Sequence, residues 1–331
     1  MIVLGIETSC DDTSAAIFDG QFLRSNIIST QLVHRRFGGI VPELASRSHI
    51  QLILPVIKEA LNQANQRLMD VEGLAVTYGP GLAGSLLVGL SVAKGLALSL
   101  HIPLIGINHL EGHIWANRLD HPEIDPPYIV LIASGGHTQI VFIREWGEYK
   151  ILGRTRDDAA GEAYDKVGKL LGVGFPGGPA IEKLAERGNP DYVHFPRAFL
   201  EEGSLDFSFS GLKTAVLNHT LTIGPKETQK HLSNIAFCFQ DAVIDILIVK
   251  SILAAKKVGV KKIGLAGGVA VNKTLQKRLV LYGKKEKIAI FWPLPIHCTD
   301  NGGMIASVGH DYIKRNITSP LTLTPAPSLN L

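Results

Sequence analysis

The amino-acid sequence predicts an α/β fold with two lobes. Short apolar segments with the length of buried strands alternate with longer segments that suit helices. A hairpin of two strands with a polar tip occurs twice, and 331 residues are enough for about two domains. We therefore expect a duplicated architecture in which each hairpin begins its own lobe.

Both hairpins consist of an apolar strand, a polar turn and a second strand. These segments are 2–6, 8–13 and 14–18 in the first hairpin and 129–133, 134–138 and 139–143 in the second. Turns rich in Gly, Ser and Thr suit phosphate, because glycine allows close backbone approach and hydroxyl groups donate hydrogen bonds. We expect both tips to face one ligand in a cleft between the lobes.

A third glycine-rich element follows the apolar segment 263–266. Gly267 and Gly268 come next, and then a predicted helix that contains Asn272. A strand that leads through glycines into a helix N-terminus is typical of anion and nucleotide sites. The GxGxxG pattern is absent, so the sequence does not support a Rossmann dinucleotide site.

Three further segments have a distinctive composition. Residues 82–100 are strongly apolar, but the central Lys94 makes a membrane span costly, so we expect a helix that is buried or packed against a partner. Residues 189–213 are predicted to be a loop or insert. The Pro-, Thr- and Ser-rich tail 318–331 is predicted to be extended or disordered.

Composition excludes several classes of protein. The formal net charge of +3 provides no basic arm that would dictate a nucleic-acid partner. The three cysteines lie far apart without a CxxC pair, which fits a reducing cytosol. The N-terminal segment has no features of a signal peptide. We therefore expect a cytoplasmic protein that does not use a membrane.

His109 and His113 are the strongest candidates for metal ligands. Residues four apart lie on one face of a helix, and this pair follows the apolar strand 103–107. Asp300 follows another apolar segment, 288–291, and two imidazoles with one carboxylate would leave coordination positions open. The spacing alone also fits a structural histidine pair. A zinc peptidase is disfavoured, because Glu111 lies about 200° around the helix from His109.

Ten distinctive motifs follow one another nearly from end to end of the chain. They are GIETSCDDTSAAI from Gly5, GGIVPELASRSH from Gly38, GPGLAGSLLVG from Gly79, HLEGH from His109, SGGHTQ from Ser134, DDAAGEAYDKVGKLLG from Asp157, FPGGP from Phe175, DFSFSGLKTAV from Asp206, AGGVAVN from Ala266 and CTDNGGMIA from Cys298. Together they resemble the motifs of the TsaD family of tRNA threonylcarbamoyl transferases. The family belongs to the actin/sugar-kinase/heat-shock-ATPase superfamily. The resemblance therefore implies two lobes around a central nucleotide cleft, which we expect to be residues 1–108 with 309–331 and residues 109–308. We expect the second lobe to carry the metal and nucleotide sites.

The resemblance also implies an activity. The threonylcarbamoyl group of threonylcarbamoyl-AMP would be transferred to the exocyclic amine of the adenosine 3′ of the anticodon, in tRNAs that read codons beginning with A. The implied metal ligands are His109, His113 and Asp300, with Fe²⁺ as the metal and Zn²⁺ as the chemical alternative. The implied partners are an inactive TsaB-like paralogue and a small TsaE-like ATPase, and residues 82–100, with Gly84, Ser85 and Gly89, could supply an interface.

Substrate-binding residues are carried over from the same motifs. They are Ile132, Ala133, Ser134, Gly135, Gly136, Asp165, Gly178 and Asn272, with Glu182, Gly267 and Gly268 as possible additions. Asp11 is a candidate for aligning the attacking amine or accepting its proton, although it could instead cap the hairpin turn. The competing functions are a kinase or ATPase, a metallopeptidase and a non-catalytic scaffold paralogue.

Overall fold

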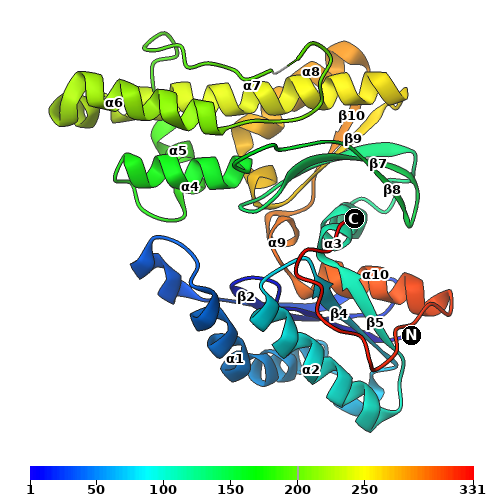
Figure 1. Cartoon of the computed structure of the whole chain (residues 1–331). Helices are drawn as coiled ribbons and strands as arrows, with labels where there is room; N and C mark the ends of the chain where they lie inside the picture. The colour runs from blue at the N-terminus through cyan, green and yellow to red at the C-terminus, as the bar shows by residue number, and fades with distance from the viewer. Residues whose placement is uncertain (200) are drawn as a thin grey trace. The chain divides into compact units, whose positions relative to one another are not determined.

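The structure is a computed structural model that describes residues 1–199 and 201–331. The chain divides into two compact units, Met1–Ile124 with Pro293–Leu331 (unit 1) and Asp125–Trp292 (unit 2). Each unit contains one five-stranded sheet with helices packed on it (Figure 1). The predicted α/β class and the duplication are both confirmed.

The sheet of unit 1 has the strand order β3-β2-β1-β4-β5. Its strands are β1 (Val3–Glu7), β2 (Asp12–Phe18), β3 (Leu23–Thr30), β4 (Gly73–Gly79) and β5 (Leu104–Asn108). Strands β1, β2 and β3 pair antiparallel, which confirms the first predicted hairpin, while β4 runs parallel to both β1 and β5. The carboxyl ends of β1, β4 and β5 therefore lie at one edge of the sheet.

Helices cover both faces of this sheet. The helical segments of unit 1 are η1 (Leu32–Phe37), α1 (Pro42–Gln63), η2 (Leu68–Asp70), α2 (Ala83–Leu100), α3 (His109–Asp120), α9 (Pro295–Cys298) and α10 (Gly302–Lys314). Leu4 and Ile6 of β1 pack in a core with residues of α1 and α2, such as Ile57 and Leu90. Gly5, between them, faces α10, so α10 lies on the opposite face (Figure 1).

The sheet of unit 2 repeats the same arrangement, with the order β10-β9-β6-β7-β8. Its strands are β6 (Tyr128–Ala133), β7 (Thr138–Glu145), β8 (Glu148–Arg154), β9 (Lys262–Ala266) and β10 (Ala289–Phe291). Its helical segments are α4 (Ala160–Leu170), α5 (Gly177–Ala185), α6 (Ser210–Lys230), α7 (Leu232–Val258), η3 (Gly268–Val271) and α8 (Lys273–Glu286). The pair β6–β7 is antiparallel and β6–β9–β10 is parallel, as in unit 1.

The unit boundaries differ from the expected ones at 108/109 and 308/309. In the structure, α3, α9 and the first half of α10 belong to unit 1 rather than to the lobe 109–308. The physical reason is that α10 lies across the sheet of unit 1 and α3 packs against α10. The second lobe accordingly begins just before β6 and ends just after β10.

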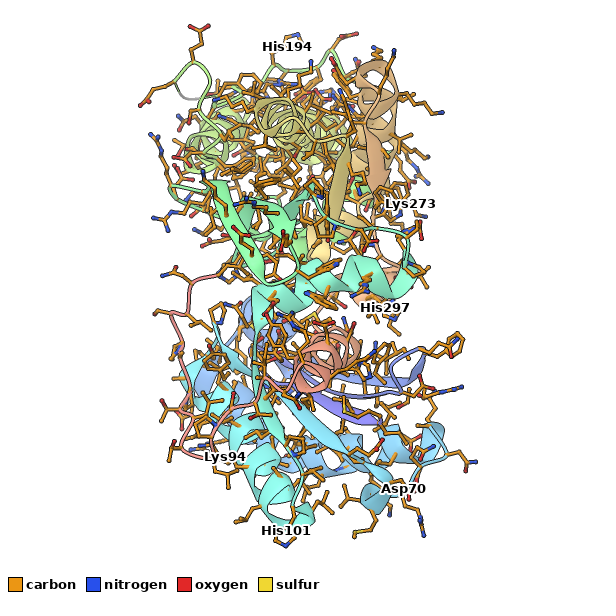
Figure 2. All side chains as sticks on the ribbon, turned by 90° about the vertical axis from the view of Figure 1, so that its right-hand side faces the viewer. Asp70, Lys94, His101, His194, Lys273 and His297 are labelled. Carbon is orange, nitrogen blue, oxygen red and sulfur yellow. The ribbon has the colours of Figure 1, made fainter. Side chains whose placement is uncertain are left out.

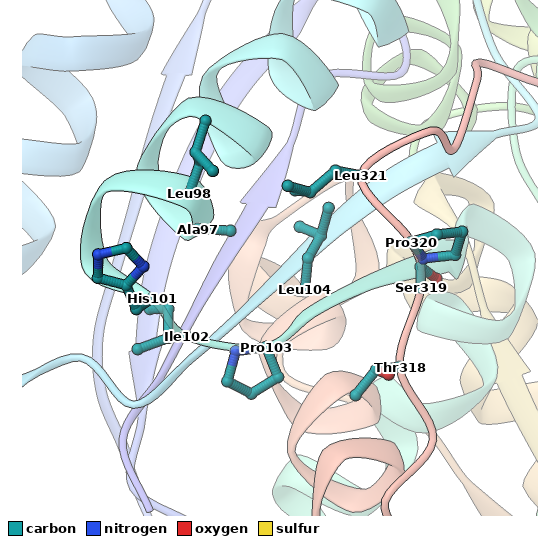
Figure 3. Close-up of a pocket in the computed structure, with 10 residues that line it drawn as sticks. All are labelled: Ala97, Leu98, His101, Ile102, Pro103, Leu104, Thr318, Ser319, Pro320 and Leu321. Carbon is teal, nitrogen blue, oxygen red and sulfur yellow. The ribbon is translucent and has the colours of Figure 1, made fainter.

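The C-terminal tail, residues 318–331, contains turns but no helix or strand, and it is bonded to unit 1. Ser319 N donates to the carbonyl of Leu104 (2.7 Å), and Ala326 N donates to that of Tyr78 (2.7 Å). A cavity of about 350 Å³ lies between the tail and the end of α2, lined by residues such as Leu98 and Leu321 (Figure 3). The tail thus covers the exposed edge of the sheet at β5.

Helix α2 is the one helix among the described residues that is long and apolar enough to cross a membrane by length and composition alone. Its central Lys94 (Figure 2) is half-buried and donates to the carbonyl of Leu323 in the tail. Ser85 and Gly89 are buried and lie against Thr8. The carbonyl of Ser85 accepts from Thr8 Oγ (2.9 Å), and a Cβ at Gly89 would lie 2.3 Å from Thr8 Oγ. These two residues are therefore not available to a partner.

We expect Gly79→Ala to destabilise unit 1. A Cβ at this position would lie 2.1 Å from the carbonyl oxygen of Ala326, a backbone atom that can move only if the tail shifts. We predict a loss of about 1–3 kcal/mol in the free energy of unfolding, measured by denaturant titration. The matched control is Gly95→Ala on α2, where a Cβ meets nothing within 4 Å and helix propensity improves by up to about 1 kcal/mol. Equal stability of the two variants would contradict the proposed packing of the tail.

Candidate functional site

The predicted histidine pair lies at the start of α3, directly after β5. Asn108 ends the strand and caps the helix, because its side-chain oxygen accepts from the N–H of Leu110 (2.9 Å). His109 and His113 lie one turn apart with ring centroids separated by 4.7 Å, and both are buried. The predicted strand, helix and shared face are confirmed.

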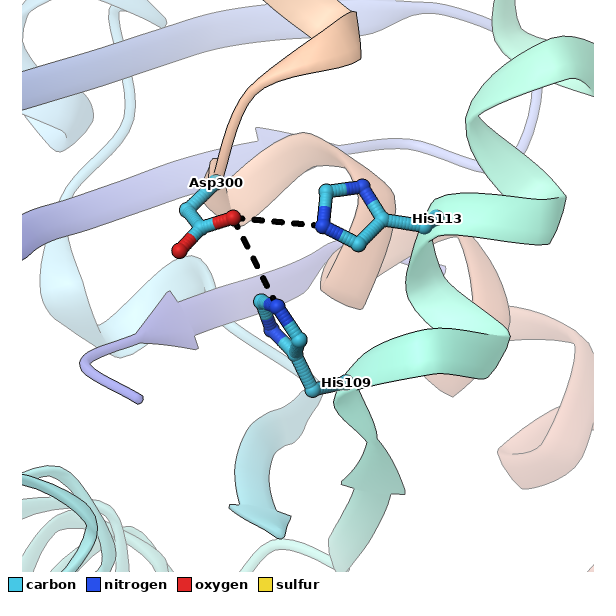
Figure 4. A group of neighbouring side chains, drawn as sticks. All are labelled: His109, His113 and Asp300. Atoms are coloured by element: carbon cyan, nitrogen blue, oxygen red, sulfur yellow. Dashed lines mark hydrogen bonds and ion pairs between the residues drawn. The ribbon is translucent and has the colours of Figure 1, made fainter. Parts of the chain in front are cut away.

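Asp300 reaches the two imidazoles from the N-terminus of α10 (Figure 4). Its Oδ1 lies 3.5 Å from Nε2 of His109 and 3.2 Å from Nε2 of His113. The following residue, Asn301, caps α10 by accepting from the N–H of Met304 (3.0 Å). The three candidate ligand atoms lie within 4.8 Å of one another, so this group can hold a metal ion. Two imidazoles and one carboxylate suit iron or zinc and leave positions for a substrate.

Glu7 is not among the site residues predicted from the sequence, although it lies in the motif that begins at Gly5. Its carboxylate is fully buried at the end of β1. Oε2 accepts from Thr77 Oγ (2.5 Å) and lies 3.0 Å from Nδ1 of His109, while Oε1 accepts from the N–H of Ser9 (2.5 Å). The available signal was an acid at the end of an apolar strand that pairs with the strand carrying Thr77.

The charges in this cluster depend on one another. Burial lowers the pKa of His109, but the carboxylates of Asp300 and Glu7 outweigh burial and raise this pKa to about 9. Burial raises the pKa of Glu7, yet the charge and hydrogen bond of His109 bring it below its usual value. Without a metal, the proton on His109 therefore supplies the positive charge that balances the two acids.

Asp11 and Asp12 lie beside the cluster, at the β1–β2 turn. Burial, together with the negative charge of Asp300, raises the pKa of Asp11. The same two causes, in the same order, raise the pKa of Asp12 to about 7. Both carboxyl groups are only partly exposed.

Glu111 faces away from the metal ligands, as predicted. Its buried carboxylate accepts a hydrogen bond from the hydroxyl of Tyr312 on α10. This placement removes the general base that a zinc peptidase of the His-Glu-x-x-His type requires.

The hairpin tip predicted to hold substrate lies in unit 2, between β6 and β7. Two hydrogen bonds hold Ser134 in place. Its Oγ accepts from the N–H of His137 (3.1 Å), and its carbonyl accepts from the N–H of Gly161 (3.0 Å). Gly135 and Gly136 are exposed, and a Cβ on either would meet nothing within 4 Å. Ile132 and Ala133 are buried in β6 itself.

The glycines after β9 approach the same hairpin. Gly267 has φ +85°, and a Cβ there would lie 2.5 Å from the carbonyl oxygen of Ala133. Only glycine fits both the backbone conformation and the space. Gly268 is exposed and open.

Three of the predicted substrate side chains make hydrogen bonds within unit 2. Asp165 Oδ1 accepts from the N–H of Gly177 (2.7 Å), and Glu182 Oε1 accepts from that of Lys273 (2.7 Å). Asn272 caps α8 instead of lying within it: its Oδ1 accepts from Leu275 N (2.9 Å) and its Nδ2 donates to Gln240 Oε1 (2.8 Å). Gly178, in the first turn of α5, has open space beside it. These residues connect α4, α5, α7 and α8.

The repeated sheets, each with parallel and antiparallel strands, define a fold of the actin-like class. Full-length HypF, in its phosphate- and nucleotide-bound form, superposes with a TM-score of 0.66 at 16% identity, covering 96% of this chain and 56% of that one. Component A of (R)-2-hydroxyglutaryl-CoA dehydratase from Acidaminococcus fermentans superposes with a TM-score of 0.59 at 14% identity, covering 95% of this chain and 99% of that one.

Sequence comparison identifies the family within this class. The TsaD family profile, described as tRNA N6-adenosine threonylcarbamoyltransferase, matches residues 22–307. Proteins of that name from Clostridium kluyveri and Clostridioides difficile are 48% and 47% identical to this chain, cover 99% and 100% of it, and are themselves covered over 97% and 98%. The chain belongs to the TsaD family. It is a transferase that acts on adenosine in tRNA.

We expect metal binding by the metal-free protein to strengthen as pH rises. Because the pKa of His109 is about 9, its imidazole carries a proton at neutral pH that the metal must displace. The apparent Zn²⁺ affinity should therefore rise nearly tenfold per pH unit between about pH 6.5 and 8.5. Calorimetry in two buffers with different ionisation enthalpies measures the released protons. Binding that is independent of pH and releases no proton would contradict this charge state.

Proposed function

We propose that the chain transfers the threonylcarbamoyl group of threonylcarbamoyl-AMP to the exocyclic amine of the adenosine 3′ of the anticodon, in tRNAs that read codons beginning with A. The observation that carries the proposal is the group of His109, His113 and Asp300, assembled in a chain that belongs to this family. A kinase has no need of two imidazoles, because Mg²⁺ prefers oxygen ligands. A scaffold paralogue has no need of three converging metal ligands. We place the reaction in the cytoplasm, which accords with three cysteines that are all free.

The metal we propose is Fe²⁺, with Zn²⁺ as the alternative that fits the same donors. The Nε2 atoms of His109 and His113 and the carboxylate of Asp300 would hold it. A bound metal would supply a Lewis acid that polarises and orients a carbonyl or phosphate oxygen of the mixed anhydride. This role requires that both histidines present Nε2 without a proton.

The chain's own groups then have separate tasks in the proposal. The N–H groups of Gly135 and Gly136, exposed at the hairpin tip, would donate to an oxygen that gains negative charge. Asp165, Gly178 and Asn272, with Ile132, Ala133 and Ser134, would line the site of the nucleotide, and Glu182, Gly267 and Gly268 would extend it. Asp11 would align the attacking amine or accept its proton, since its raised pKa brings it closer to neutrality than an exposed aspartate.

The proposed transfer is tested by incubating the chain with threonylcarbamoyl-AMP and unmodified tRNA, with and without the partner subunits. Nucleoside mass after digestion measures the product. We expect His109→Ala to lose both bound metal and product. Asp11→Asn should keep the metal and lose at least about tenfold in rate, because a general base contributes roughly 100-fold or more.

Each result separates the alternatives. Product formed by His109→Ala at the native rate would make the metal structural. Full activity of Asp11→Asn with unchanged metal content would leave Asp11 as a turn-capping residue. No product from the native chain with partners present would favour the ATPase or scaffold alternatives.

For the partners, we propose tRNA, a TsaB-like paralogue and a small TsaE-like ATPase. The surface proposed for the paralogue is formed by exposed apolar side chains of α1 and α2. Ser46 on α1 contacts Gly84 on α2, and one turn further along each helix Ile50 and Leu87 are 64% and 54% exposed. Leu54, a turn beyond Ile50, is 60% exposed. A cluster of exposed apolar side chains on adjacent helices is typical of a protein–protein interface.

We expect Leu54→Glu with Leu87→Glu to abolish the complex with the paralogue. Two buried carboxylates would lack partners at the apolar interface, so the dissociation constant should rise at least about 100-fold. Size-exclusion chromatography and calorimetry measure complex formation, and Zn²⁺ binding should be unchanged. The matched control is Leu281→Glu on α8, where the leucine is equally exposed at 59%. An intact complex in the double variant would exclude this surface.

A further inference from the structure

We infer that Glu7 is a positioning residue that holds the Nδ1–H tautomer of His109, so that Nε2 remains available to the metal. The inference rests on the proposed metal site and assigns a specific task to a residue outside the ligand group. It concerns which ring nitrogen carries the proton, a property that metal binding depends on directly.

Every polar neighbour of the Glu7 carboxylate can be a donor. The backbone N–H of Ser9 points at Oε1 (2.5 Å), and the hydroxyl of Thr77 donates to Oε2 (2.5 Å). Nδ1 of His109 lies 3.0 Å from that same Oε2, and Ser9 Oγ lies 3.2 Å from Nδ1. A carboxylate has only acceptors, so His109 must donate from Nδ1 to make this bond.

The opposite edge of the ring, which carries Nε2, is directed at the other candidate metal ligands. Nε2 of His109 lies 3.5 Å from Oδ1 of Asp300. Glu7 and Asp300 therefore contact different nitrogens of one imidazole, and only Nε2 points to the atoms that can hold a metal. This is the arrangement in which a carboxylate orients a metal-binding histidine and increases its basicity.

His113 provides a contrast within the same site. In the part of the chain that the structure describes, its buried Nδ1 has no hydrogen-bond partner. Of the two imidazoles, only His109 has a carboxylate on the nitrogen remote from the metal site. The two ligands therefore differ in how their tautomer is set, and the effect of Glu7 should be confined to His109.

The sheet holds Glu7 in place. Ile6 of β1 is paired with Val76 of β4, and Thr77 of β4 is paired with Ile107 of β5. Glu7 follows Ile6, and Thr77 follows Val76. These two residues and the β5–α3 junction therefore lie together at the carboxyl edge of three parallel strands. Because the bonding groups lie on paired strands, their separation is set by the sheet and not by flexible side chains alone.

An amide in place of the carboxylate should reverse the tautomer. In Glu7→Gln, the Ser9 N–H can only donate, so it takes the amide oxygen. The amide NH₂ then faces Thr77, whose hydroxyl can turn to accept, and Nδ1 of His109. A ring that accepts at Nδ1 carries its proton on Nε2, which blocks the metal-binding nitrogen.

The experiment is a Zn²⁺ titration of the full-length metal-free protein against a chromophoric chelator. We expect Glu7→Gln to weaken Zn²⁺ binding by about 10–100-fold. Thr77→Val, which keeps the charge but removes one donor to it, should weaken binding by less. The matched control is Glu111→Gln, since Glu111 is also buried on this unit but contacts Tyr312, and its Zn²⁺ affinity should equal that of the native chain.

A second measurement separates positioning from a general loss of structure. Long-range ¹H–¹⁵N spectra of both metal-free proteins, recorded at a pH at which the His109 ring is neutral, should report a proton on Nδ1 in the native chain. In Glu7→Gln they should report the proton on Nε2, with a native circular dichroism spectrum. Native Zn²⁺ affinity in Glu7→Gln, or a proton that stays on Nδ1, would overturn the inference.

The same titration distinguishes this inference from the proposed function. If His109→Ala binds Zn²⁺ as tightly as the native chain, the proposed metal site is wrong and the inference fails with it. If His109→Ala loses Zn²⁺ while Glu7→Gln keeps it, the metal site stands and only the positioning role of Glu7 is refuted.

Discussion

The close contact between α10 and the β1–β2 hairpin is the constraint on which the metal group depends. A Cβ on Gly5 would lie 2.3 Å from the carbonyl oxygen of Gly302, and a Cβ on Gly302 would lie 2.7 Å from the N–H nitrogen of Ala16. The N–H of Gly302 also donates to Ser14 Oγ (2.8 Å). Asp300 directly precedes this contact, so any larger side chain at either glycine would push the carboxylate away from the histidines. The acid and the imidazoles are far apart in the sequence, and backbone packing brings them together.

Charge burial is the second constraint, because Glu7 and His109 are buried and Asp300 is only 23% exposed. Buried carboxylates are costly unless positive charge and hydrogen bonds compensate. In the metal-free state a proton on His109 provides that charge, and a divalent ion placed at Nε2 would replace it with a larger one. Burial, reinforced by the negative charge of Asp300, also raises the pKa values of Asp11 and Asp12. The cluster is therefore suited to bind a cation and to release the proton of His109 to solvent as it does so.

Local patterns predicted the elements that depend on neighbouring residues. Strand and turn composition located both hairpins, and the four-residue spacing placed His109 and His113 on one helical face. Features that depend on packing between segments far apart in the sequence could not be predicted from local patterns. The compact units end elsewhere than the expected lobes because α3 packs on α10, a contact that periodicity does not reveal. The bonds that hold the tail have acceptors on β4 and β5. In the sequence, Glu7 does not differ from any other acid at the end of a strand. Only the parallel pairing of β1, β4 and β5 places it beside His109.

The two units differ in the polar groups that a ligand can reach. In unit 1 the side-chain atoms of His109, His113 and Asp300 converge on one point. In unit 2 the carboxylates of Asp165 and Glu182 and the amide of Asn272 already bond backbone or side-chain groups. The glycines Gly135, Gly136 and Gly268 of unit 2 are exposed, so a ligand can approach their backbone closely. Backbone N–H groups recognise phosphate and carbonyl oxygens by geometry and not by side-chain identity. Unit 1 thus offers a ligand converging side-chain atoms, whereas unit 2 offers exposed backbone groups.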